Sequence, residues 1–148
     1  MSVSFDGLTP SNLPTNQRAI VDANYQVTRA LPSSATTLYS SSLDLGDVVS
    51  GIPFATTETI NVQVLAPALT NGQMSTNTVT YTIQDSADNS SFADTVLTKA
   101  YTGSGSGMSA ATVTFKLQPG NRRYIRLSVT NSGSSDMSAS TATLQLAF

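Results

Sequence analysis

The chain has 148 residues, a formal net charge of −2 and only 11% charged residues, which suits one domain with a sizeable core and excludes a surface field strong enough to gather nucleic acid or an anionic membrane. Histidine and cysteine are absent, which excludes disulfides, the commonest general base, the commonest metal ligand and every Ser-His or Cys-His nucleophile. We therefore expect a protein that is not an enzyme, needs no metal or cofactor and has no small-molecule substrate.

Residues 1–35 differ from the rest of the chain and predict an extended N-terminal arm. They contain three of the six prolines, at Pro10, Pro14 and Pro32, and proline favours extended or turn backbone. A short helix over Arg18–Leu31 is the competing interpretation, because apolar residues recur there near helical spacing. Most of its central residues are mediocre helix formers and no good cap precedes them, so the arm is favoured. The sequence also allows a strand within the arm.

The first residues carry neither a basic stretch nor an apolar one, and no apolar run reaches the length of a membrane span. The sequence therefore predicts a soluble product that is made in the cytoplasm without a secretion signal.

Residues 36–148 have the composition and periodicity of a β-sandwich domain. Serine and threonine make up 43 residues of the chain, whereas glutamate occurs only once, and threonine suits strands as serine suits turns. Turn residues separate stretches that alternate apolar and polar positions. The predicted strands are Thr37–Leu45, Glu58–Leu65, Thr78–Gln84, Thr95–Tyr101, Ala111–Leu117, Arg123–Thr130 and Thr141–Phe148.

This pattern predicts an all-β fold of two packed antiparallel sheets. Several strands have one clearly apolar face that should point inward: Ile60, Val62 and Val64; Val113, Phe115 and Leu117; Ile125, Leu127 and Val129; Ala142, Leu144 and Leu146. A jelly roll and an immunoglobulin-like sandwich both satisfy the spacing, so periodicity leaves the topology open.

Two segments look like ligand-binding loops but lack the residues that such loops need. The segment Asp85–Asn89 has neither the alternating carboxylates nor the distal glutamate of a calcium loop. The segment Gly103–Gly107 alternates glycine and serine, yet no Gly-Lys-Ser/Thr follows as in a phosphate-binding loop. We interpret the first as a turn and the second as a flexible hairpin tip.

Motifs along the chain resemble the capsid cement, or decoration, proteins of tailed bacteriophages. The similarity covers 22–148 and rests on the order of its pieces, none of which is specific alone. The pieces are Ala30-Leu31-Pro32, Ser-Ser-Leu-Asp-Leu-Gly at 41–46, Tyr81–Phe92 with Gln-Asp-Ser-Ala-Asp, the glycine loop 103–107, and Arg-Tyr-Ile-Arg at 123–126. The resemblance implies a jelly roll and a homotrimer on the outer surface of the virion head, where it would bind the major capsid protein.

From this resemblance and from the sequence we expect residues of the arm and an arginine cluster to contact the capsid or a neighbouring subunit. These are Leu8, Leu13, Arg18, Ile20, Tyr25, Arg29, Arg122, Arg123 and Arg126. For the three clustered arginines, a solvated strand edge that discourages unwanted pairing is the competing interpretation. The alternative function is a carbohydrate-binding or adhesion module, which would use exposed tyrosines such as Tyr25, Tyr39, Tyr101 and Tyr124.

Overall fold

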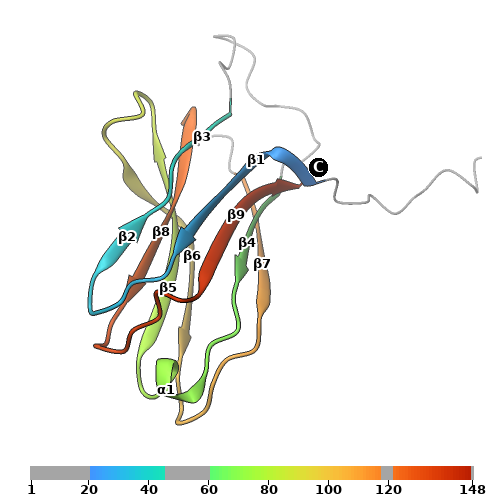
Figure 1. Ribbon diagram of the computed structural model, residues 1–148. Coiled ribbons are helices and arrows are strands. Elements are labelled where there is room, and N and C mark those ends of the chain that lie inside the picture. Colours follow the sequence, from blue (N-terminus) through green and yellow to red (C-terminus); the bar gives the residue numbers. More distant parts are fainter. Residues whose placement is uncertain (1–20, 46–60, 118–121, 148) are drawn as a thin grey trace, which may run out of the picture.

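The computed structural model describes residues 21–45, 61–117 and 122–147. This part of the chain folds into two packed antiparallel sheets with one short helix at an end of the sandwich (Figure 1). The all-β sandwich predicted from the sequence is therefore confirmed. In chain order the elements are β1 (Val21–Ala30), β2 (Thr37–Tyr39), β3 (Leu43–Asp44), β4 (Asn61–Ala66), α1 (Asn71–Met74), β5 (Thr78–Ser86), β6 (Ala93–Thr102), β7 (Ala111–Lys116), β8 (Tyr124–Asn131) and β9 (Thr141–Ala147).

The strand order is that of a jelly roll. The first sheet runs β1-β9-β4-β7, and the second runs β2-β8-β5-β6 with β3 also paired to β8. Because β2 and β3 pair with successive parts of β8, they act as one interrupted strand, and the sandwich has the eight strand positions of this fold. Successive strand positions alternate between the sheets except at the β5–β6 hairpin, whereas an immunoglobulin sandwich joins several neighbouring strands within one sheet.

The end of the expected arm belongs to the sandwich. Val21–Ala30 forms β1, which pairs with β9 at the edge of the first sheet. This stretch is therefore a strand and not a helix, because its backbone groups bond across the sheet. The described part of the sandwich begins at Val21, before the expected boundary at residue 36, and residues 1–20 of the expected arm lie outside the described part.

Apolar side chains from both sheets form one core. The inward residues expected on β8 and β9 are buried, as are Val62 and Val64 of β4; Ile60 lies outside the described residues. Val113, Phe115 and Leu117 are only partly buried. They lie on or beside β7, an edge strand that has β4 as a neighbour on one side, so less of the second sheet covers them.

The connection between β4 and β5, one of the stretches between predicted strands, contains a short helix. Thr70 caps α1: its hydroxyl accepts a hydrogen bond from the Gln73 backbone N–H at 3.3 Å, and the Gln73 side chain accepts one from the Thr70 backbone N–H at 2.9 Å. This reciprocal capping box is a recognisable Thr-x-x-Gln signal. The buried Met74 then anchors the helix to the core.

The glycine-rich loop after β6 is held closely against this helix. A Cβ on Gly103 would lie 2.8 Å from the carbonyl oxygen of Met74 and would also meet that of Ser75. Gly105 has a φ of +80°, which favours glycine. Part of the loop expected to be a flexible tip therefore needs glycine for a close backbone approach.

Candidate functional site

The outer face of the second sheet gathers the most distinctive polar groups in the described part of the chain. Strand register places these residues in three rows across the sheet. The rows are Thr37, Thr130, Thr80 and Ala100; Tyr39, Ser128, Thr82 and Thr98; and Arg126, Gln84 and Asp94. We call this surface the outer face throughout.

Hydroxyl groups on the outer face bond to one another across the strands. The Oγ1 atoms of Thr37 and Thr130 lie 2.8 Å apart, and those of Thr82 and Thr98 lie 3.0 Å apart. Such cross-strand pairs stabilise a sheet. They also fix the rotamers of the side chains, so this part of the face presents methyl groups and hydroxyl oxygens in a set arrangement.

Arg126 lies at the β8 end of the third row. Its Cζ atom lies 4.1 Å from the centroid of the Tyr39 ring and 3.9 Å from that of Phe92, so the guanidinium is held between two aromatic rings. Its Nε donates a hydrogen bond to Gln84 Oε1 at 2.8 Å. Gln84 in turn donates from Nε2 to Asp94 Oδ1 at 2.7 Å. Contacts from β2, β5 and the residue before β6 thus fix the plane of one arginine.

Arg123 is paired within the chain. Its Nε and Nη2 donate to Asp44 Oδ1 and Oδ2 at 2.7 Å and 2.8 Å, and its guanidinium lies over the Tyr124 ring at 5.0 Å. This fork ties β8 to β3. The pair is about half exposed, so solvent screens it and its contribution to stability is modest.

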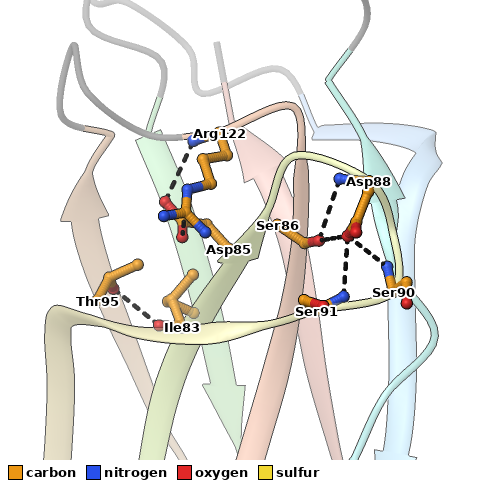
Figure 2. Close-up of polar contacts among 8 residues, drawn as sticks. All are labelled: Ile83, Asp85, Ser86, Asp88, Ser90, Ser91, Thr95 and Arg122. Atoms are coloured by element: carbon orange, nitrogen blue, oxygen red, sulfur yellow. Dashed lines mark hydrogen bonds and ion pairs between the residues drawn. The ribbon is translucent and has the colours of Figure 1, made fainter.

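Arg122 is the most exposed of the three clustered arginines. Its backbone N–H donates to Asp85 Oδ2 at 3.1 Å, and its Nε lies 4.0 Å from Asp85 Oδ1 (Figure 2). The side chain is 52% exposed whereas that of Asp85 is 13% exposed. This contact closes the end of the sandwich near β5, and the long distance makes it a weak ion pair.

The acidic segment after β5 is a turn stabilised by Asp88. Its Oδ1 accepts hydrogen bonds from the Ser86 hydroxyl at 2.8 Å and from the backbone N–H groups of Ser90 and Ser91 at 2.9 Å and 2.8 Å (Figure 2). The two backbone bonds, then the Ser86 bond, hold the pKa of Asp88 at about 2. Across the described ranges, no group of three or more acidic side chains is placed to hold a metal ion.

The expected interface residues fall in three places. Leu8, Leu13, Arg18 and Ile20 lie outside the described residues. Tyr25 and Arg29 lie on β1, on the first sheet, where Tyr25 is 37% exposed and the Arg29 Nε is buried with no partner in the described part of the chain. The three clustered arginines lie on or just before β8, so the two groups of residues belong to different sheets.

The tyrosines considered for sugar binding are also divided. Tyr25 lies on the first sheet, while Tyr101 packs edge-on against the buried Tyr81 at 6.2 Å between ring centroids. Tyr39 and Tyr124 belong to the second sheet, and each has an arginine guanidinium over its ring. One face of each of these two rings is therefore already in contact.

Arg126 is among the interface residues expected from the sequence, whereas its neighbours Gln84, Asp94 and Phe92 are not. Phe92 and Asp94 follow the turn that reverses the chain from β5 into β6, and a bulge lies between the Thr82 and Gln84 register positions. The alternating pattern of each strand gave the face of each residue but not the register between strands.

Neither the family models nor the curated proteins yielded a match to this chain. Within 21–45, 61–117 and 122–147 there is no helix with the length and apolar character required to cross a membrane.

Proposed function

We propose that this chain is a non-enzymatic cement protein that binds the outer surface of an assembled phage head and joins neighbouring major capsid subunits. The observation that carries the proposal is the outer face, where an arginine and two aromatic side chains lie beside interlocked hydroxyl groups. Arginine and aromatic residues are enriched where proteins bury surface against each other. The resemblance of its motifs to those of capsid cement proteins indicates that the partner is a major capsid protein.

The proposed mechanism is bridging. A protein that buries surface against several capsid subunits at once binds only the assembled shell, so its binding free energy adds to the stability of the shell and opposes rupture by packed DNA. A surface with few charges and many hydroxyl groups forms hydrogen bonds without requiring matched charges. We further propose a homotrimer, in which contacts between sandwich edges present three outer faces together.

Binding to empty heads that lack the protein tests this proposal directly. The purified chain should sediment with such heads, and decorated heads should withstand heat and osmotic shock better than bare ones. Light scattering coupled to gel filtration, with a map of decorated heads, should give a trimer. Heads that do not bind the chain, or that rupture equally with and without it, contradict the cement function; a monomer both in solution and on the head contradicts the trimer alone.

A further inference from the structure

Arg126 has hydrogen-bond donors left over after its contacts within the chain. Its Nε donates a hydrogen bond to Gln84. Neither terminal nitrogen donates a hydrogen bond to any residue that the structure describes. These nitrogens are also not among the buried polar atoms without a partner, so water reaches them. Ile125 and Leu127, the neighbours of Arg126 on β8, are fully buried, which places Arg126 on the opposite side of the sheet, toward solvent.

The guanidinium is preorganised for one geometry. The rings of Tyr39 and Phe92 lie within 4.1 Å of Cζ, and the Gln84 that anchors Nε is itself only 9% exposed and anchored by Asp94. Most of the rotamer entropy that an exposed arginine loses on binding has therefore been lost on folding. Two parallel terminal N–H groups match a carboxylate, which accepts both as a fork.

The aspartates whose side chains are described are all engaged within the chain. Each of them already accepts at least one hydrogen bond inside the chain: Asp44 from Arg123, Asp85 from Arg122, Asp88 from Ser86, Asp94 from Gln84 and Asp136 from Ser138. A second copy that used one of these aspartates would have to share a carboxylate already engaged within its own chain. Charge complementarity favours a carboxylate as the ligand of Arg126, and the proposed function makes the major capsid protein the source of that carboxylate.

We propose that Arg126 is the receptor for an acidic side chain of the major capsid protein, held by the terminal guanidinium nitrogens between Tyr39 and Phe92. This inference rests on the proposed function and names the side chain that would bind the capsid protein. Arg123, three residues earlier, serves as the control for cross-linking, because its guanidinium already holds Asp44.

Binding of variants to empty heads gives the first test. Arg126→Met keeps an unbranched side chain between the two rings but removes the donors, and it should weaken binding about tenfold or more, as for other interface hot spots. Lys116→Met, which removes an exposed cation from β7 in the first sheet, should bind like the wild type. Circular dichroism and melting temperature verify that both variants are folded. A folded Arg126→Met variant that binds like the wild type overturns the inference and leaves the cement function standing, whereas a wild-type chain that does not bind heads overturns both.

Zero-length cross-linking identifies the partner group. Arg126→Lys supplies a primary amine at the same place, and a water-soluble carbodiimide joins an amine to a contacting carboxylate as an amide while the reagent becomes a urea. At concentrations that saturate the heads, mass spectrometry should find position 126 linked to an aspartate or glutamate side chain of the capsid protein. The control Arg123→Lys should link to Asp44 in its own chain. The proposal is contradicted if position 126 links to a C-terminal carboxylate or to a second copy, or if decorated heads show no link. It is also contradicted if the wild type binds an acidic glycan and Arg126→Met does not.

Discussion

The buried hydroxyl of Tyr81 lowers the stability of the fold, and a single substitution should remove this effect. Tyr81 has no exposed surface, and its hydroxyl has no hydrogen-bond partner among the described residues. Burial of this group also raises the pKa of Tyr81, so the side chain stays neutral. An unpaired buried polar group costs about 1–3 kcal/mol relative to one that is bonded.

We therefore predict that Tyr81→Phe leaves the fold unchanged and increases the free energy of unfolding by about 1 kcal/mol. Urea denaturation measures the change, and Tyr101→Phe is the control because Tyr101 is only partly buried and its hydroxyl is not an orphaned buried group. A loss of stability in Tyr81→Phe would mean that its hydroxyl has a partner, such as an ordered water molecule.

Acid should weaken the turn after β5 in a defined range of pH. The folded-state pKa of Asp88, about 2, lies below the ordinary value of 3.8, so its contribution to stability is complete above the ordinary value and is lost as the pH falls toward 2. Asp88→Asn has no carboxyl group to protonate. We predict that the melting temperature of the wild type falls more steeply between about pH 4 and pH 2 than that of Asp88→Asn. Asp136, whose pKa is also lowered by its bonds to Ser138, contributes in the same direction in both proteins, so parallel curves would refute the role of Asp88.

At the scale of elements, the junction between α1 and the loop after β6 depends on one small residue. A Cβ on Gly103 would collide with backbone carbonyl groups at the end of α1, which cannot move as a flexible side chain would. Gly72 lies inside the same helix, where an added Cβ would have Thr70 Oγ1 as its nearest neighbour at 3.9 Å.

We predict that Gly103→Ala lowers the free energy of unfolding by about 1–3 kcal/mol through overpacking. Gly72→Ala should be neutral or stabilising by up to about 1 kcal/mol, because alanine is the better helix former. Paired denaturation curves of the two variants measure this contrast. Equal effects would show that the loop shifts away from the helix without cost.

At the scale of the whole molecule, deletions can separate the described strand β1 from the residues before it. The strand β1 covers one edge of β9 and carries the expected contacts Tyr25 and Arg29. The other expected arm contacts fall within residues 1–20, outside the described part. Deleting residues 1–18 leaves every described strand in place, while deleting residues 1–30 also removes β1.

We predict that the shorter deletion keeps the β-sheet circular dichroism spectrum but weakens attachment to heads. The longer deletion should unfold or aggregate, because the edge of β9 and part of the core beside it would be exposed. Loss of folding in the shorter deletion would show that residues 1–18 are needed for the fold. Unchanged attachment to heads would show that residues 1–18 do not contribute to the interface.

The sequence by itself determined the all-β class and the inward faces of the central strands, because burial of one side of a pleated strand imposes an apolar–polar period of two on the order of residues. It did not determine that Val21–Ala30 is a strand, since an edge strand at the end of a sheet alternates less clearly. The choice of jelly roll also required tertiary structure, because β1 and β9 are far apart in the sequence and strand order is a matter of long-range pairing. The same holds for the outer face: Arg126 was visible in the sequence, but only the register of β8, β5 and β6 brings Gln84 and Asp94 beside it, and only packing places it between Tyr39 and Phe92.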